Sequence, residues 1–460
     1  MDRRTFLKGL AGASAIGVAA AVGCDNPNSK KAEGFAAGEV PAGKMTYRPN
    51  THGQQVSLLG FGMMRLPAEG GGTGSNRDKN DAPLDQEQIN RMVDYAIEHG
   101  VNYFDTSPVY CKGRSETVTG IALNRHPREK WLVATKLSNF RTWTREASLK
   151  MYHESFEKLQ VEYIDYYLLH SFGAPGDFNK RFVENGMLDF LMEEREKGRI
   201  RNLGWSFHGV QEEFDMVVGL HEKYHWDFAQ IQMNYVDWLY AHEIEEENVN
   251  AQHLYTELDK KEIPIVIMEP LLGGRLATLN EPLARRLKER EPDRSLASWA
   301  FRYLGMFPRI MTSLSGMSFI EHVEDNVRTH SPVEPLADDE MQLLERIADE
   351  YAHFPVIPCT TCQYCMPCPY GLNIPGIFAF YNKCLGDGII MTEGTAEQRE
   401  FRKARRDFLT GYDKSIERLR QADHCIGCGE CLKHCPQHIA IPDKMRMIED
   451  YTNKLKDSLV

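Results

Sequence analysis

Short apolar runs alternate with longer amphipathic stretches along most of the chain. After the first run, VSLLGFGMMRL (56–66), Asp85 with Gln88 three residues later is typical of a helix N-terminus. The apolar positions after this point recur at helical spacing; they are Ile89, Met92, Val93, Ala96 and Ile97. Gly100 then marks the end of the predicted helix. The next run, VNYFDTS (101–107), is typical of a strand. The pattern therefore predicts a strand, a helix and a second strand.

The same alternation continues to about Asn326 and gives eight strand-like runs, each followed by a helix-length stretch such as 148–160 or 214–225. The runs cover residues 56–66, 101–107, 131–137, 163–170, 200–206, 227–235, 263–269 and 309–315. Because strands that alternate with helices pair in parallel, eight repeats predict an α/β fold, a closed (β/α)8 TIM barrel. An open doubly wound sheet is disfavoured, since no Gly-x-Gly-x-x-Gly follows an early strand. The glycine-rich segment between Leu66 and Pro83 predicts a flexible loop near the barrel mouth.

Chain length indicates how many domains to expect, and net charge indicates which partners are disfavoured. The chain has 460 residues, which is too many for one ordinary core, so two domains are expected. It carries 54 basic and 66 acidic residues, for a formal net charge of −12, with no long basic run outside the N-terminus. Nucleic acid is not expected as a partner, because phosphate binding needs a concentrated basic face.

The N-terminus differs from the rest of the chain. Its apolar run from Gly9 to Gly23 is too short and too rich in Ala and Gly for a membrane span. Residues 1–24 resemble a twin-arginine export signal, and the residues that fit are Arg3, Arg4, Phe6, Leu7 and Lys8. AVGC resembles a lipoprotein cleavage box with Cys24 as the acylated residue, and whether it is lipidated stays open. The polar residues 25–44 suit a flexible tether.

These features predict an exported protein that is periplasmic or anchored on the extracytoplasmic side of the membrane. The membrane would then be contacted only through a lipid on Cys24. A disordered basic N-terminus is the alternative.

Four residues at predicted strand ends are chemically suggestive, because chemistry in such a barrel lies at the carboxyl ends of the strands. Asp105 ends the second strand, and Tyr110 lies five residues further on. Lys136 lies near the end of the third strand, and His170 closes the fourth.

The segments around these residues resemble the aldo-keto reductase family. The matching segments are YFDTSPVYCKGRSE, VATK and YYLLHS, and the likeness spans roughly residues 45–330. The resemblance implies that Asp105, Tyr110, Lys136 and His170 form a catalytic tetrad that reduces an aldehyde or ketone with a nicotinamide cofactor. The substrate would be a small carbonyl compound or a sugar-like one.

The chemistry of these side chains agrees with that implication. A free tyrosine has a pKa of about 10 and is a slow proton donor at neutral pH. A neighbouring cation lowers that pKa, so we expect Tyr110 to be the general acid and Lys136 to adjust its pKa. Asp105 would keep Lys136 charged and oriented. His170 would donate a hydrogen bond to the substrate oxygen.

The same resemblance implies a set of cofactor-binding residues. Ser206 and Gln230 would hold the nicotinamide carboxamide. EPLLGG, from Glu269 to Gly274, would border the pyrophosphate, and LSGMSFIEHVEDN, which contains Gly316 and Asn326, would lie at the adenosine phosphate.

Four positions depart from the family pattern. Phe207 stands where the family commonly has Asn, and Met268 stands where many members stack a Tyr on the nicotinamide. Ser318 and Phe319 replace the usual basic pair, which leaves His322 as the nearest cation. Because a 2′-phosphate is bound best by Arg or Lys, the choice between NADP and NAD stays open.

Eight of the eleven cysteines fall into two groups near the C-terminus. The first group is Cys359, Cys362, Cys365 and Cys368, and the second is Cys425, Cys428, Cys431 and Cys435. The second group is the C-x2-C-x2-C-x3-C-P run of bacterial ferredoxins, whereas the first is one residue shorter before its last cysteine. The residues after each group also repeat, CPYGLNIP against CPQHIAIP, as in dicluster ferredoxins.

We expect two [4Fe–4S] clusters, because three-residue spacing lets a loop wrap three corners of a cluster while the fourth ligand comes from the other group. One cluster would take Cys359, Cys362, Cys365 and Cys435, and the other Cys425, Cys428, Cys431 and Cys368. Zinc and disulfides are less favoured alternatives. Cys384 could replace a ligand, and Cys111 is expected to be a packing residue.

The sequence thus predicts a barrel over residues 45–345 and a small cysteine-rich, ferredoxin-like α+β or helical domain over 346–460. The expected function is an exported oxidoreductase that couples nicotinamide-dependent carbonyl reduction to electron transfer through two clusters, with a tightly held dinucleotide. One alternative is an electron-transfer subunit that docks a redox partner through a non-catalytic barrel. Another is an extracytoplasmic binding protein for sugar-like ligands.

Overall fold

The computed structural model describes most of the chain. The described residues are 43–75, 81–245, 247–353, 356–359, 361, 363–391, 398–435 and 439–458. The predicted signal at 1–24, nearly all of the tether at 25–44, and Cys362 therefore lie outside them. Within the described residues, no helix is both long and apolar enough to cross a membrane.

The contacts divide the chain into two compact units. The barrel unit comprises the described residues of Met1–His242, Glu247–Ala277 and Ala297–Glu345, and the C-terminal unit those of Glu243–Glu246, Thr278–Leu296 and Arg346–Val460. The long C-terminal segment of the second unit thus begins at Arg346, directly after Glu345 of the barrel unit. Residues 278–296, which the sequence division had assigned to the barrel, group with the C-terminal unit.

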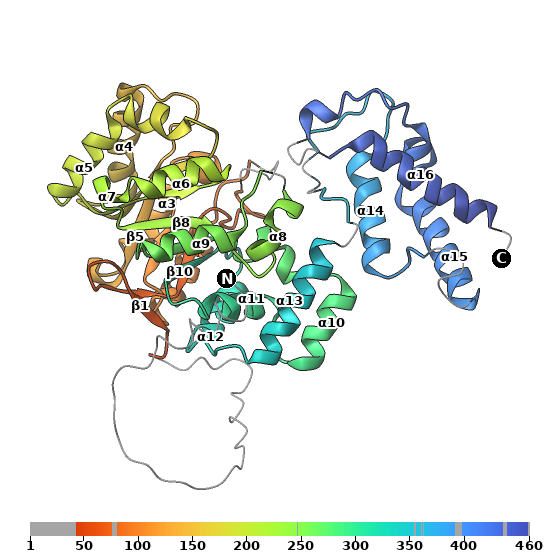
Figure 1. The fold of residues 1–460 in the computed structure, drawn as a ribbon, viewed down its shortest axis with the longest axis horizontal. Coiled ribbons are helices and arrows are strands. Elements are labelled where there is room, and N and C mark those ends of the chain that lie inside the picture. Colours follow the sequence, from red (N-terminus) through yellow and green to blue (C-terminus); the bar gives the residue numbers. More distant parts are fainter. Residues whose placement is uncertain are drawn as a thin grey trace, which may run out of the picture. The chain divides into compact units, whose positions relative to one another are not determined.

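Eight parallel strands form a closed barrel in the order β10-β3-β4-β5-β6-β7-β8-β9 (Figure 1). The strands are β3 (Leu59–Gly62), β4 (Tyr103–Asp105), β5 (Leu132–Leu137), β6 (Ile164–Phe172), β7 (Ile200–Phe207), β8 (Phe228–Gln232), β9 (Ile265–Met268) and β10 (Ile310–Ser315). Each lies within or overlaps one of the eight predicted runs. Because the strands run parallel, their carboxyl ends meet at one rim. The predicted TIM barrel is confirmed.

The first predicted run is divided between two structures. Gln55–Ser57 is strand β2, which pairs antiparallel with β1 (Tyr47–Pro49), and only Leu59–Gly62 joins the barrel. The Arg48 side chain in this hairpin donates hydrogen bonds to the backbone oxygens of Phe307, Ile310 and Gly305. The hairpin is therefore fixed to the segments around β10. The apolar run continues across this break, which is why the pattern did not locate it.

Helices follow the barrel strands. In the barrel unit they are α2 (Gln86–Glu98), α3 (Ser115–Leu123), α4 (Arg145–Leu159), α5 (Met187–Glu196), α6 (Gln211–Gly219), α7 (His221–Tyr224), α9 (Ala251–Lys260), α11 (Leu296–Gly305) and α12 (Ile320–Thr329). The unit boundaries fall within α8 (Asp237–Ile244) and α13 (Asp338–Ala352), and after Leu296, the first residue of α11. Asp85 caps α2 as expected, since its carboxylate accepts a hydrogen bond from the Gln88 backbone at 2.9 Å. The stretch 214–225 is two helices rather than one.

The glycine-rich segment is more ordered than predicted. Among its described residues, Pro67 and Ala68 form isolated antiparallel bridges with Thr73 and Leu84. Leu66, Ala68 and Leu84 are buried. Residues 76–80 lie outside the described part of the chain. The described part of this segment therefore packs onto the barrel unit and is not a free loop.

The described residues of the C-terminal unit form helices joined by cysteine-bearing loops. The helices wholly within the unit are α10 (Glu281–Arg290), α14 (Ile374–Gly386), α15 (Gln398–Ser415) and α16 (Ile441–Asp457), and α15 packs against both α14 and α16. Their core includes Ile377, Phe378, Phe408, Met445 and Ile448, all fully buried.

Both copies of the internal sequence repeat end at the start of a helix. The Ile-Pro pair at the end of CPYGLNIP starts α14, and the pair at the end of CPQHIAIP starts α16. Proline suits the first turn of a helix, where its missing N–H costs no hydrogen bond. Each cysteine group is therefore followed by a new helix.

Candidate active site

Asp105 and Lys136 form a buried pair at the carboxyl end of the barrel. Asp105 is the last residue of β4, and Lys136 lies on the adjacent strand β5. The Lys136 Nζ donates hydrogen bonds to Asp105 Oδ1 at 2.6 Å and to the Thr106 backbone oxygen at 2.8 Å. Both side chains are almost fully buried.

Burial opposes the charged form of both groups. It lowers the pKa of Lys136, while the charges of Asp105 and, more weakly, Glu116 act in the other direction. It raises the pKa of Asp105 against the effect of Lys136. Asp105 Oδ2 has no hydrogen-bond partner among the described residues. One carboxylate oxygen thus holds the lysine, and the other remains available to a ligand.

Tyr110 lies beside this pair but does not behave as predicted. It begins the short helix η1 (Tyr110–Gly113), and the Lys136 Nζ lies 4.8 Å from the centroid of its ring. Burial raises the pKa of Tyr110 well above its ordinary value, and the carboxylates of Asp105 and Glu269 add to the effect. The pKa of Tyr110 is therefore raised rather than lowered as predicted, chiefly because the phenol is buried and also because Asp105 is close. The phenol keeps its proton at neutral pH.

His170, on β6, completes the predicted group of four. Its ring lies edge-on to the Tyr110 ring, with 5.9 Å between the centroids. Burial lowers the pKa of His170 well below its ordinary value, and the charge of Lys136 adds to the effect, so the imidazole is neutral. The structure thus brings Asp105, Tyr110, Lys136 and His170 together.

Two serines that the sequence analysis did not single out support His170. Ser138 Oγ is hydrogen-bonded to His170 Nδ1, and Ser107 Oγ lies 2.8 Å from Ser138 Oγ. Both serines are buried. The sequence did indicate these serines, because each follows a predicted site residue by two positions. Side chains two apart in a strand point to the same face.

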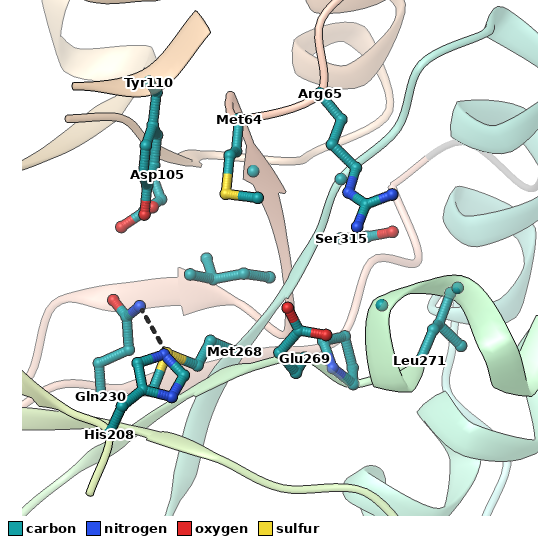
Figure 2. A pocket seen from close by; sticks show the side chains of 16 residues that line it. Met64, Arg65, Asp105, Tyr110, His208, Gln230, Met268, Glu269, Leu271 and Ser315 are labelled. Carbon is teal, nitrogen blue, oxygen red and sulfur yellow. Dashed lines mark hydrogen bonds between the residues drawn. The ribbon is translucent and has the colours of Figure 1, made fainter. Parts of the chain in front are cut away.

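A cavity of about 190 Å³ opens at this end of the barrel (Figure 2). Its lining includes six of the predicted site residues, namely Asp105, Tyr110, Gln230, Glu269, Gly274 and Gly316. Lys136, His170, Ser206, His322 and Asn326 are not part of that lining. The cavity thus joins the Tyr110 side of the site to the loops after β9 and β10.

Gln230 presents an unsatisfied group to the cavity. Its Nε2 donates to the Met268 sulfur at 3.5 Å, while its Oε1 is buried without a hydrogen-bond partner among the described residues. Ser206 lies beside it in the register of β7 and β8, but its Oγ accepts a hydrogen bond from the Ser171 backbone at 2.8 Å. Gln230 is therefore the residue of this pair that is free to accept a hydrogen bond from a ligand.

The loops at the other end of the cavity contain glycines with left-handed backbone. After β9, Glu269 has a φ of 54°, and Gly273 and Gly274, in the short helix η4 (Leu272–Ala277), have φ of 68° and 98°. A glycine takes these angles without strain and leaves room for a ligand to approach the backbone.

His322 does not supply a cation to the cavity. Its Nδ1 accepts a hydrogen bond from the Ser318 backbone at 3.3 Å, and Asn326 donates to the Ser315 hydroxyl at 2.9 Å. Arg65 lines the cavity instead, with His208 and Met64. None of these three residues was predicted. Met64 and Arg65 lie near the end of the first predicted run, 56–66, and His208 lies two residues beyond the run 200–206.

A second cavity lies in the C-terminal unit, and four cysteines line it. They are Cys368, Cys425, Cys428 and Cys431, the set predicted to hold one cluster. Burial raises the pKa of the Cys431 thiol to about 11, with smaller contributions from Cys425, Cys428 and Cys368. The remaining apolar lining comes from the cysteine-bearing loops and from the starts of α14 and α16. In the described part of the chain, no three His, Cys, Asp or Glu side chains form a site for a single metal ion.

The other cysteines divide into two kinds. Cys359, Cys365 and Cys435 are partly buried against the core of the C-terminal unit, while their predicted partner Cys362 lies outside the described residues. Cys384 is buried in α14, where burial raises the pKa of its thiol to about 12, and it does not line the cysteine cavity. Cys111 is fully buried, with its Sγ 3.4 Å from the Met64 backbone oxygen, which fits the predicted packing role.

The Asp105–Lys136 pair gives a testable prediction. Asp105→Asn leaves the Lys136 ammonium buried without a counter-charge, so we expect the barrel unit to lose about 3 to 5 kcal/mol of unfolding free energy. Tryptophan fluorescence during urea unfolding measures this directly, because all six tryptophans lie in the barrel unit. Adding Lys136→Met should restore much of the loss, whereas equal stability of wild type and Asp105→Asn would contradict the pairing.

Comparison with known proteins agrees with this geometry. The profile of the aldo/keto reductase family matches residues 58–349, and that of the 4Fe-4S dicluster domain matches 358–440. The chain is 31% identical over 250 residues to "Probable aldo-keto reductase 1" of Glycine max, covering 52% of this chain and 64% of that protein. It is 24% identical over 322 residues to "L-galactose dehydrogenase" of Arabidopsis thaliana, covering 64% of this chain and 90% of that protein.

Solved structures show the same fold. An aldo-keto reductase from Klebsiella pneumoniae in complex with NADPH superposes with a TM-score of 0.51 at 18% identity, over 66% of this chain and 95% of that chain. The closed barrel and the family profile, which spans more than half of the sequence, lead to one conclusion. The chain belongs to the aldo/keto reductase family of oxidoreductases and carries a C-terminal 4Fe-4S dicluster domain.

Proposed function

We propose that the chain catalyses reversible, nicotinamide-dependent reduction of a small carbonyl or sugar-like compound and exchanges electrons through two [4Fe–4S] clusters. The observation that carries this proposal is the grouping of Tyr110, the Asp105–Lys136 pair and the unsatisfied Gln230 at one barrel mouth. A sugar-like substrate is supported by the name of the Arabidopsis relative. The Klebsiella complex with NADPH supports NADP as the cofactor.

The cavity residues fit a nicotinamide dinucleotide. Gln230 Oε1 is a buried acceptor without a partner among the described residues, as a carboxamide NH2 requires. Gly273 and Gly274 line the same cavity, and their backbone there carries no side chain. When bound, the nicotinamide would supply or accept the hydride.

In this proposal the chain supplies the proton. Tyr110 is protonated at neutral pH, since its pKa is raised, and it donates that proton to the carbonyl oxygen. Lys136, 4.8 Å from the phenol ring, then stabilises the phenolate that remains. Asp105 keeps the lysine in position.

His170 orients the substrate oxygen. We assign Ser138 as the donor of the hydrogen bond to His170 Nδ1, which leaves Nε2 carrying the proton of the neutral imidazole. That N–H can donate to the same carbonyl oxygen as Tyr110. Two donors thus stabilise the charge that develops on this oxygen.

The cysteine cavity fits an iron–sulfur cluster. Four thiols, three from one sequence group and one from the other, line one cavity, as a ferredoxin cluster requires. A cluster bound there would carry single electrons. A hydride is two electrons and one proton, so two one-electron clusters would match one turnover when a proton from solvent is taken up or released with the electrons. A redox partner protein would donate or accept those electrons. We further propose that Cys359, Cys362, Cys365 and Cys435 hold the second cluster.

The proposed catalytic role of Tyr110 can be tested directly. Tyr110→Phe removes the proton donor and keeps the ring, so carbonyl turnover should fall by about 10²- to 10⁴-fold. Steady-state oxidation of NADPH with a panel of aldehydes, ketones and aldoses measures it, and NADPH binding should be unchanged. Turnover that is equally low in wild type and variant, with intact cluster reduction, would favour the electron-transfer subunit instead.

The ligand assignment makes a separate prediction. Cys368→Ala removes one thiol from the cysteine cavity, so the anaerobically purified variant should lose about half of its iron and sulfide and one cluster signal in electron paramagnetic resonance. Cys384→Ala is the matched control and should keep the wild-type iron content, because Cys384 is buried on α14 and does not line the cysteine cavity. Equal iron in wild type and Cys368→Ala, or zinc alone in the wild type, would contradict the assignment.

We also propose export through the twin-arginine route, with or without lipid on Cys24. This proposal rests on the motif at Arg3 and Arg4. Replacing both arginines by lysine should retain the protein in the cytoplasm, because that route depends on the arginine pair. Immunoblots of periplasmic, membrane and cytoplasmic fractions measure the distribution. An identical distribution for wild type and variant would rule out the route.

A further inference from the structure

The barrel cavity contains a guanidinium group that the tetrad chemistry does not use. Arg65 follows β3, and its backbone oxygen accepts a hydrogen bond from the Ser318 hydroxyl at 2.7 Å. Its side chain extends along Gly316, where an added Cβ would lie 3.4 to 3.7 Å from Arg65 Cδ, Cγ and Cβ. Figure 2 shows the guanidinium beside Ser315 at the edge of the cavity. The position of Arg65 is thus fixed by the loop after β10.

This guanidinium lacks a counter-charge. Among the described residues, no carboxylate lies within ion-pair distance of Arg65, and its side-chain nitrogens donate no hydrogen bond within the chain. Glu269 also lines the cavity, but the two side chains do not form an ion pair. A half-buried cation with five N–H donors and no protein acceptor is suited to an anionic ligand.

The loop after β9 offers side-chain-free backbone near the guanidinium, with the Glu269 carboxylate also close, since Glu269 Oε2 lies 3.3 Å from the position of an added Cβ on Gly273. An added Cβ on Gly273 would lie 3.9 Å from Arg65 Nη2, and the φ of Gly273 and Gly274 lie in the left-handed region. A ligand can therefore approach the backbone of this loop closely while it contacts the arginine. An arginine opposite a glycine loop fits a phosphate group, which accepts two parallel N–H bonds.

We propose that Arg65 binds the pyrophosphate of the dinucleotide. This inference rests on the proposed function. Arg65 and Gln230 line the same cavity, and only one ribose separates a nicotinamide from its nearest phosphate. The 2′-phosphate of NADP belongs to the other ribose, further from Gln230. Arg65 therefore sets the affinity for both dinucleotides and does not choose between them.

Equilibrium binding tests this assignment without a catalytic readout. The full-length protein, purified anaerobically and stripped of bound dinucleotide, is titrated separately with NADPH and NADH by isothermal titration calorimetry. Arg65→Gln should weaken binding of both by roughly the same factor, about 10- to 100-fold, because a charge-assisted contact is lost. Arg65→Lys should recover part of the affinity, since it keeps the charge but not the planar fork.

Arg91→Gln is the charge-matched control. Arg91 is exposed on α2 of the same unit and does not line the cavity, so its loss should leave both affinities unchanged. Iron content and circular dichroism identical to wild type show that each variant is folded.

Three outcomes would overturn the assignment. Unchanged binding by Arg65→Gln, with normal binding by the wild type, overturns the role of Arg65 alone. Weaker binding of NADPH only overturns the pyrophosphate contact and moves Arg65 to the 2′-phosphate. A wild-type protein that binds neither dinucleotide overturns the proposed function, and the inference with it.

Discussion

A lysine buried at the end of a closed barrel must have its charge compensated, and the site is organised around this constraint. Asp105 supplies the compensation from the neighbouring strand, within hydrogen-bond distance. The pair fixes the ammonium beside the ring of Tyr110. Tyr110 keeps its proton chiefly because burial raises the pKa of the phenol, and the carboxylate of Asp105 adds to that effect. In this site, solvent exclusion outweighs the neighbouring charge.

Much of the barrel could be predicted from the sequence, because each buried strand is a short apolar run and each run is followed by an amphipathic stretch. The pattern could not show that β2 pairs with β1 outside the barrel, since apolar residues stand on both sides of Ser57 and the predicted run 56–66 extends across the break. Nor could it assign residues 278–296 to the C-terminal unit, because amphipathic periodicity does not say which core a helix covers.

The candidate site was predictable where residues lie at strand ends and not where loops supply them. Asp105, Tyr110, Lys136 and His170 meet because parallel strands end at one rim. Arg65 and His208 line the cavity from loops, which have no periodic pattern to indicate their direction. The direction of the pKa shift of Tyr110 was missed for a related reason, since the depth of burial depends on the packing of elements far apart in the sequence.

The cysteine cavity is lined by Cys368, in the loop before α14, and by three cysteines in the loop before α16. Helix α15 lies between these two loops in the chain. A cluster ligated by all four would act as a cross-link that closes a long loop, and such closure removes conformational entropy from the unfolded chain. Loss of the metal would then loosen both helix starts at once rather than only one loop. Binding of this cluster would therefore be coupled to the ordering of the starts of α14 and α16.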